Sequence, residues 1–422
     1  MNEDILEGRI RPAARRRGRW LTQRARSGVL ALLSQLREGR LHLCEDGREQ
    51  IFGEPAPEPG LVARVDIRDP RCFADIALGG TVGVAEAYMA GDFDCDDPTA
   101  LVRIFVRNRE VMERMEGGAA RLLMPVLRLA HHLNRNTRRG SRRNIAAHYD
   151  LGNPFFQLFL DPTMMYSSAI YPREDAPLEE AAVHKLEVIC QKLDLRPEDH
   201  LLEIGTGWGG LAVHAAGRYG CRVTTTTLSS EQHALARERV AAAGLADRVE
   251  VVQCDYRDLR GQYDKLVSIE MFEAVGHRYF RTFFNQCAEL LKPAGQMLLQ
   301  TITIADQQFE QAKRSVDFIQ RYIFPGGCLP SVAAIADAVA SASDLRIVDL
   351  DDIGPHYART LRDWRARFQD NLHEVRRLGY PESFVRMWDW YLCYCEGGFL
   401  ERAIGDVQVV LSKPRNLRPL PV

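Results

Sequence analysis

The sequence has few of the features that mark membrane-spanning, metal-binding or nucleic-acid-binding proteins. No run in its 422 residues approaches the roughly 18 apolar residues that a membrane-spanning helix needs. The ten cysteines show neither CxxC nor Cys/His spacing, which argues against a zinc site and predicts reduced thiols in a cytoplasmic protein. The formal net charge of −2 provides no overall field that would attract a nucleic acid. These absences leave a globular protein of two domains or one large domain.

A glycine-rich segment, HLLEIGTGWGG at residues 200–210, is the most informative feature of the chain. It predicts a short apolar strand, a tight turn, and a helix that opens at Trp208. Gly205 and Gly207 lack Cβ atoms, so the backbone can turn there and approach a ligand closely. Their spacing suits either a dinucleotide or another nucleoside-bearing cofactor.

A further absence decides between these cofactors. An NAD site has Asp or Glu about 20 residues after the glycines, but the second predicted strand, residues 222–229, reads RVTTTTLS. Glu203 stands just before the turn, where its carboxylate could meet a positively charged amino-acid tail. The segment therefore favours an S-adenosylmethionine (SAM) site over the site of an NAD-dependent oxidoreductase.

From about residue 183, strand-like and helix-like segments alternate. This pattern predicts an α/β fold with a doubly wound, seven-stranded, mostly parallel sheet of the Rossmann-like type. The candidate strands are residues 200–205, 221–227, 248–254, 264–269, 296–304, 345–351 and 407–412. The stretch 305–340 is too long for a simple crossover and is expected to form a lid or a substrate wall.

The rest of the chain predicts a second, smaller domain. Residues 1–134 should form a mainly helical N-terminal lipid-binding or accessory domain, with one strand at 61–67 and a mobile, Arg-rich segment over the first 19 residues. Residues 135–143 are expected to be a basic linker. The methyltransferase catalytic domain should then extend over residues 144–422.

Ligands of open parallel sheets bind beyond the carboxyl ends of the strands, so the candidate cofactor contacts follow the predicted strands. Thr227 and Leu228 end the second strand, and the amide of Gln232 could reach the ribose hydroxyls in place of the missing acid. Asp255 follows the third strand, where it could accept a hydrogen bond from the adenine amino group, and Tyr256 could cover the ring. The alternative for Asp255 is a carboxylate that caps a turn.

The fourth strand is followed by two carboxylates, Glu270 and Glu273, in the mainly apolar segment SIEMFEAVG at residues 268–276. A buried carboxylate is costly unless it has a partner, so at least one of the two is expected to have a function. Two upstream segments, 148–153 and 164–171, are rich in aromatic hydroxyls that could face a sulfonium ion. The alternative is that these aromatic side chains pack into the core.

Several motifs together resemble those of the cyclopropane-fatty-acyl-phospholipid synthase family. They are HYDLGN at 148–153, MYSSA at 165–169, EIGTGWG at 203–209, TLS at 227–229, MFEAVG at 271–276 and YIFPGGCLPS at 322–331. The last motif is highly specific. The resemblance is strong over about 141–414, and a weaker one at 77–92 extends it into the N-terminal domain.

The resemblance implies a SAM-dependent C-methyltransferase that methylates a cis double bond in an acyl chain of a membrane phospholipid. Loss of a proton from the added carbon then closes a cyclopropane ring. The SAM contacts that it implies are Tyr166, Ser167, Gly205, Gly207, Thr227, Leu228, Gln232 and Ile269.

The resemblance also implies an active-site bicarbonate that accepts the proton, held by a Cys, a Glu, a His, an Ile backbone and a Tyr. Three of these groups match Glu273, Ile302 and Tyr357, whereas Ser168 replaces the Cys and Gln300 replaces the His. These two replacements leave open whether bicarbonate is bound. We therefore expect Glu273 to be the base or to orient a water or bicarbonate, with Glu270 and His148 as further candidates.

Other functions remain open at this stage. The same methyl transfer could give a methyl-branched or methylene fatty acid, and related folds methylate small molecules at nitrogen or carbon. A lipid-binding paralogue without activity is a third alternative. Residues 101–149 carry eleven Arg, no Lys and three Glu, which favours peripheral binding to anionic phospholipid on the inner face of the cell membrane. The sequence leaves open whether the chain forms a homodimer.

Overall fold

The computed structural model describes residues 19–54, 60–117, 136–137, 140–141 and 151–417. The described chain forms two compact units. Unit 1 comprises residues 1–133, 314–325 and 364–403, and unit 2 comprises 134–313, 326–363 and 404–422. Residues 314–325 and 364–403 were expected in the catalytic domain from the sequence, but in the structure they pack within unit 1. The N-terminal Arg-rich segment, most of the predicted linker and His148 lie outside the described residues.

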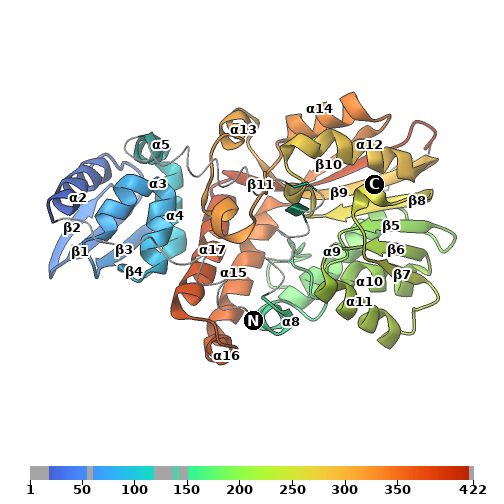
Figure 1. The fold of residues 1–422 in the computed structure, drawn as a ribbon, viewed down its shortest axis with the longest axis horizontal. Coiled ribbons are helices and arrows are strands. Elements are labelled where there is room, and N and C mark those ends of the chain that lie inside the picture. The colour runs from blue at the N-terminus through green and yellow to red at the C-terminus, as the bar shows by residue number, and fades with distance from the viewer. Residues whose placement is uncertain (1–18, 55–59, 118–135, 138–139, 142–150, 418–422) are drawn as a thin grey trace. The chain divides into compact units, whose positions relative to one another are not determined.

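Unit 2 is built on a seven-stranded sheet with helices on both faces (Figure 1). The strand order is β10-β11-β9-β8-β5-β6-β7, and β11 is antiparallel to both of its neighbours. The strands are β5 (His200–Ile204), β6 (Arg222–Thr226), β7 (Val249–Val252), β8 (Tyr263–Ile269), β9 (Leu291–Ile304), β10 (Arg346–Asp352) and β11 (Ile404–Ser412). The predicted doubly wound sheet is confirmed, and β9 alone begins five residues before its predicted start at 296.

Each face of this sheet has its own apolar core. Leu201 and Leu202 are neighbours on β5 and point to opposite faces, as pleated strands require. Leu201 packs with α9 and α10, and Leu202 packs with α12 and α14. The helices of unit 2 are α8 (Asn153–Gln157), α9 (Leu178–Lys192), α10 (Gly210–Tyr219), α11 (Ser230–Ala242), α12 (Phe280–Leu290), α13 (Asp306–Ala312) and α14 (Val332–Ala342). A longer helix, α15 (Gly354–Asp370), begins in unit 2.

The strand order places the ligand-binding edge of the sheet. The order reverses between β5 and β8, which are neighbours although two strand–helix units separate them in sequence. Ligands of such sheets bind beyond the carboxyl ends of the strands at this switch point. The carboxyl ends of β5, β6 and β8 are therefore where a cofactor site is expected.

Unit 1 combines helices with a small sheet of order β2-β1-β3-β4. The strands are β1 (Arg40–Glu45), β2 (Arg48–Phe52), β3 (Val62–Ile67) and β4 (Phe93–Cys95), and only β3 was predicted. The helices are α2 (Arg19–Leu33), α3 (Cys72–Met89), α4 (Pro98–Arg107), α5 (Arg109–Gly117), α16 (Leu372–Arg377) and α17 (Glu382–Leu400), with a π-helical turn at Ile319–Ile323. Helical residues outnumber strand residues, in agreement with the mainly helical domain that the sequence predicts.

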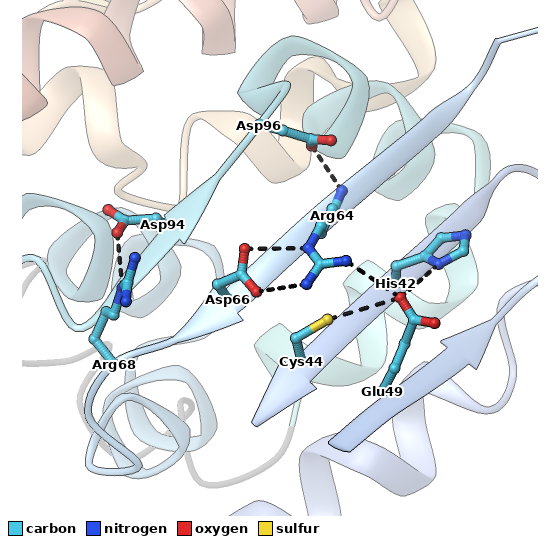
Figure 2. A network of polar contacts seen from close by, with 8 residues as sticks. All are labelled: His42, Cys44, Glu49, Arg64, Asp66, Arg68, Asp94 and Asp96. Atoms are coloured by element: carbon cyan, nitrogen blue, oxygen red, sulfur yellow. Dashed lines mark hydrogen bonds and ion pairs between the residues drawn. The ribbon is translucent and has the colours of Figure 1, made fainter. Parts of the chain in front are cut away.

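One face of the small sheet carries a network of charged side chains (Figure 2). The guanidinium of Arg64 donates to Asp66 at 3.3 Å and lies 3.5 Å from Glu49, while Arg68 donates to Asp94 at 2.9 Å. The side chains of Arg64 and Asp66 are 51% and 40% exposed. Exposed ion pairs of this kind contribute at most about 1 kcal/mol each, so the network indicates a solvated face and not a buried site.

Helix α17 packs closely on α4 within unit 1. A Cβ atom at Gly397 would lie 2.8 Å from Cγ1 of Val102, so a larger residue would force the two helices apart. Just beyond the end of α17, Glu401 accepts hydrogen bonds from Nε of Arg103 at 2.6 Å and from Nε of Arg107 at 2.7 Å. One carboxylate thus joins two arginines on successive turns of α4.

Glutamine in place of Glu401 should lower the free energy of unfolding by about 1–3 kcal/mol, because it replaces the charged acceptor that two partly buried guanidinium groups share by a neutral one. The matched control is Glu382→Gln, at the start of the same helix. Glu382 pairs with Arg376 at 3.0 Å and its side chain is 61% exposed. The control should change stability by less than about 0.5 kcal/mol in chemical denaturation. Equal losses in the two variants would contradict this account of the α4–α17 contact.

Candidate active site

The glycine-rich turn after β5 has open space beside it. Gly205 and Gly207 have φ angles of +105° and +51°, in the region that favours glycine. The backbone N–H groups of Gly205 and Thr206 both donate to the carbonyl oxygen of Thr226 at 3.0 Å, which anchors the turn to β6. A Cβ atom at Gly207 would meet no atom within 4 Å. The turn therefore fits the close approach of a cofactor such as SAM.

A buried chain of hydrogen bonds lies under this turn. The hydroxyls of Thr206 and Thr225 are 2.7 Å apart, and the Thr225 hydroxyl donates to Oε2 of Glu203 at 2.6 Å. Glu203 is only 2% exposed, and burial raises its pKa to about 8. The hydrogen bond from Thr225 joins β5 to β6. The predicted contact of Glu203 with the amino-acid tail of the cofactor stays a prediction.

The predicted ribose-binding residues lie together after β6. The Thr227 hydroxyl donates to Oε1 of Gln232 at 2.8 Å, and Ser229 caps α11 by accepting from the Gln232 N–H at 3.2 Å. Leu228 and Ile269 are half-buried at the carboxyl ends of β6 and β8. The structure thus collects these four predicted cofactor residues at the switch-point edge. Their contacts with SAM remain a prediction.

Asp255 has the contacts of a turn cap. Its Oδ1 accepts from the backbone N–H of Arg257 at 3.0 Å, and the guanidinium of Arg257 forks onto both carboxylate oxygens at 2.8 and 2.6 Å. The neighbouring Tyr256 packs edge-on against Phe283, with ring centroids 5.4 Å apart. The structure therefore shows the alternative that the sequence left open for Asp255, and the predicted adenine contacts of Asp255 and Tyr256 stay untested.

The aromatic residues upstream of the sheet form one cluster. Tyr166 lies 5.3 Å from Phe156 between ring centroids, and Phe156 lies 5.0 Å from Trp208. The indole nitrogen of Trp208 donates to Asn153 at 2.6 Å. Phe156 and Trp208 are buried, whereas Tyr166 is half-buried. Packing thus accounts for most of this cluster, and Tyr166 is its member with surface left for a ligand.

The segment after β8 places a carboxylate where three predicted anion-binding groups converge. Oε1 of Glu270 accepts from the backbone N–H of Ser168 and from Nε2 of Gln300, both at 2.8 Å. Oε2 of Glu270 accepts from the hydroxyl of Tyr357 at 2.6 Å. Burial raises the pKa of Glu270, and these hydrogen bonds oppose that effect. The sequence predicted that Ser168, Gln300 and Tyr357 hold an anion together with Glu273. In the structure all three donate to Glu270, and the shared anion stays a prediction.

Glu273 keeps one of its predicted neighbours. Its Oε1 accepts from the backbone N–H of Ile302 at 2.5 Å, and its Oε2 is buried and has no hydrogen-bond partner among the described residues. Burial, together with repulsion from Glu270, raises the pKa of Glu273 to about 8, which favours the protonated form. Its predicted role as a base requires the ionised form, which this environment disfavours.

Two further charged residues belong to this cluster and were missed from the sequence. Lys185 on α9 is 0% exposed and donates to the hydroxyl of Ser167 at 2.6 Å. Asp406 on β11 is also 0% exposed, and its Oδ2 lies 3.4 Å from Nε2 of Gln300. Burial lowers the pKa of Lys185 to about 8, while nearby carboxylates, first Glu270, partly restore it. Lys185 thus supplies positive charge to a group of acids.

A signal for Lys185 was present in the sequence. It occupies the apolar stripe of α9, four residues after Ala181 and four before Ile189, where a charged residue is costly unless it has partners. Asp406 gave no such signal, because it lies near the start of a strand where polar residues are common.

The described part of the chain lacks two other kinds of site. No group of His, Cys, Asp or Glu within it is arranged to hold a metal ion. None of the helices in that part is both long and apolar enough to cross a membrane.

The sheet order, the glycine turn at the switch point and the residues collected there define a class I SAM-dependent methyltransferase. The family model described as mycolic acid cyclopropane synthetase matches residues 136–409. The chain belongs to this family, which confirms the resemblance that its motifs indicated.

Similar proteins come from several bacteria. The chain is 41% identical over 331 residues to the tuberculostearic acid methyltransferase UfaA1 of Mycobacterium tuberculosis, with 77% of each chain covered. It is 38% identical over 354 residues to the cyclopropane-fatty-acyl-phospholipid synthase of Escherichia coli, covering 83% of this chain and 88% of that one.

Solved structures agree with this assignment. The cyclopropane synthase MmaA2 from Mycobacterium tuberculosis has a TM-score of 0.61 and 33% identity, covering 64% of this chain and 98% of its own. The mycolic acid cyclopropane synthase CmaA1, complexed with S-adenosylhomocysteine and CTAB, has a TM-score of 0.60 at the same identity and coverage.

Proposed function

We propose that this enzyme transfers the methyl group of SAM to the cis double bond of an unsaturated acyl chain in a membrane phospholipid, and that the product is a cyclopropane fatty acid. The observation that carries the proposal is the cluster of Glu270, Glu273 and Asp406 next to the glycine turn. A Cβ atom at Gly205 would lie 3.3 Å from Cβ of Met271, so the turn and this acidic segment are in contact. The name of the 38% identical Escherichia coli relative supports the phospholipid substrate.

The residues present suit this chemistry. SAM, when bound, supplies an electrophilic methyl group, and methylation of an alkene leaves a carbocation that must lose a proton. The side chains around the acids exclude water, since Ser168 and Gln300 are 0% exposed. Glu270 as a whole residue is half-buried, and both of its carboxylate oxygens accept hydrogen bonds. A shielded proton acceptor beside the cofactor turn is what ring closure requires.

A second product has its own support. Ser168 and Gln300 replace the Cys and His of the family pattern, and the 41% identical relative is named a tuberculostearic acid methyltransferase. A different proton loss from the same cation would give a methylene fatty acid, and later reduction would give a methyl branch. The methylene and methyl-branched products would form through the same first methyl transfer as the cyclopropane.

Lipid analysis of a host that makes unsaturated phospholipids separates these outcomes. With methyl-labelled methionine in the medium, mass spectrometry should show one labelled carbon added to unsaturated phospholipid acyl chains. Proton NMR of the extracted fatty acids then distinguishes the cyclopropane ring from a methylene or methyl-branched chain. A purified enzyme that binds SAM but labels no lipid would contradict the proposal and favour a small-molecule methyltransferase or an inactive paralogue.

Access to such a substrate calls for binding at a membrane surface, which we include in the proposal. The basic stretch 101–149 is its support, but part of that charge is engaged within unit 1. Arg103 and Arg107 pair with Glu401, Arg109 pairs with Glu113, and Arg114 donates to Gln35. The other arginines of the stretch, in residues 118–149, lie outside the described residues.

Co-sedimentation with anionic vesicles should therefore weaken as salt rises, because surface charge is screened within about 10 Å at 0.1 M salt. Replacing Arg142 and Arg143 by glutamine should weaken binding by about 2 kcal/mol, since each near-surface arginine contributes about 1 kcal/mol. The matched control replaces Arg376 and Arg377, another adjacent pair outside the stretch. Equal binding to neutral vesicles at every salt concentration would show that apolar insertion holds the protein there.

A further inference from the structure

We infer that the carboxylate of Glu270 occupies the place of the expected bicarbonate and is itself the proton acceptor of the reaction. This inference rests on the proposed function and identifies the base at the proposed site. It selects Glu270, one of the further candidates, in place of Glu273, and it answers the question of bicarbonate that the sequence left open.

The first support is the set of donors. Five groups were expected to hold bicarbonate, and three of them, Ser168, Gln300 and Tyr357, donate to Glu270 at 2.6–2.8 Å. A carboxylate and a bicarbonate both present a planar, negatively charged pair of oxygens to such donors. Because the side chain of Glu270 occupies these donors, the residues present do not fit a bicarbonate at this position.

The second support is the backbone of Glu270. Its φ angle is +45°, in the left-handed region that non-glycine residues seldom adopt. Glycine would adopt this conformation without strain. Strained residues of this kind persist where the surrounding structure holds them, and they cluster at active sites. A glutamate at a position that suits glycine indicates that its side chain is needed there.

The third support is the charge around Glu270. The hydroxyl of Tyr357 and the amide of Gln300 hold its two oxygens. Burial and the charge of Glu270 raise the pKa values of Glu273 and Asp406, which favours the uncharged forms of these two acids, while the charge of Lys185 lowers the pKa of Glu270. Among the three acids, Glu270 is therefore the one whose ionised form has both hydrogen-bond donors and a nearby cation.

The proton transfer balances without another reactant. Methylation forms a carbon–carbon bond, breaks the sulfur–methyl bond, and leaves S-adenosylhomocysteine and a carbocation on the acyl chain. A C–H bond of the added carbon then breaks. Its electron pair forms the last bond of the ring, and its proton moves to an oxygen of Glu270. The resulting carboxylic acid loses this proton to solvent before the next turnover.

Two variants test the inference in buffers depleted of carbon dioxide. Glu270→Gly removes the side chain and relaxes the backbone, so it should free the three donors for bicarbonate. Glu270→Gln keeps the side-chain volume but cannot accept the proton. Both should lower turnover by about 10²–10⁴-fold, the usual contribution of a general base. Added bicarbonate should restore activity to Glu270→Gly alone, and the wild-type rate should not respond to it.

Calorimetry with bicarbonate provides a readout that does not depend on activity. Binding is expected for Glu270→Gly and not for the wild-type enzyme or Glu270→Gln. SAM affinity and circular dichroism verify folding, and the exposed Glu238→Gln should behave as wild type. Bicarbonate binding by the wild-type enzyme, or normal turnover of Glu270→Gln, would overturn the inference. If the wild-type enzyme methylates no lipid, the proposed function is wrong. Calorimetry then still tests whether Ser168, Gln300 and Tyr357 hold the carboxylate of Glu270 or a bicarbonate.

Discussion

Valine in place of Gly207 should abolish SAM binding while leaving the fold of unit 2 intact. The φ angle of Gly207 is +51°, and a Cβ atom there would enter open space beside the turn. A branched side chain would fill the space through which the cofactor must approach the backbone. Calorimetric titration with SAM should show no binding, and circular dichroism should show an unchanged helix and strand content.

The matched control separates loss of the cofactor site from backbone strain. Gly244 follows α11, has a φ angle of +69°, is exposed, and also has no atom within 4 Å of an added Cβ. Gly244→Val therefore carries similar strain away from the site and should retain SAM binding. If Gly207→Val binds SAM with unchanged affinity, the turn at Gly207 is not the SAM site. If Gly244→Val loses SAM affinity to the same extent, backbone strain and not the cofactor site explains the loss.

Methionine in place of Lys185 should lower the free energy of unfolding by about 3–5 kcal/mol near neutral pH, the range found when one partner of a buried ionic group is removed. Lys185 is 0% exposed and lowers the pKa values of Glu203 and Glu270 by its charge. Without it, those carboxyl groups must stay protonated or remain charged in a poorly solvated environment. Urea denaturation of the two proteins measures the difference.

The loss should also depend on pH in a defined direction. An acid whose pKa is higher in the folded than in the unfolded state costs stability as pH rises above its unfolded value of about 4.3. Removal of Lys185 raises the folded pKa values further, and that of Glu203 is already about 8, so the contribution of Glu203 to the deficit should change little between pH 5 and pH 7 and grow as pH rises above 8. Lys265→Met is the comparison, because buried Lys265 donates to the uncharged Oε1 of Gln296 at 2.9 Å. A deficit of Lys185→Met that is constant with pH would contradict the assigned charge balance.

The large sheet could be predicted because its strands are strongly apolar and alternate with helices. All seven strands were found, and Gly205 and Gly207 correctly marked the switch point between β5 and β8. The strands of the small sheet were harder to find. Only one of its faces is apolar, and charged residues such as Arg64 and Glu49 lie on the other, so β1 and β2 show a weak pattern.

The sequence predicted which residues make up the site, but not which of them form hydrogen bonds with one another. Ser168, Gln300 and Tyr357 were identified as one group, and Glu270 was recognised as a carboxylate in an apolar segment. Which of two acids three residues apart meets that group depends on the backbone after β8, where Glu270 takes a φ angle of +45°. No sequence pattern encodes that angle for a glutamate. Lys185 joins the same site from a helix far upstream, so only the fold reveals the contact.

Unit 1 is built from three separate stretches of the chain, and this limits how the protein can be divided into fragments. The chain passes between the units after residues 133, 313, 325, 363 and 403, and α17 packs on α3 and α4 although some 300 residues separate them. A fragment starting at residue 134 would keep α17 but lose the helices that cover it. Residues 1–133 are therefore joined to the rest of the chain by packing as well as by sequence. A change on the α17 side of this contact calls for a matching change in α3 or α4, so residues far apart in the chain are expected to vary together.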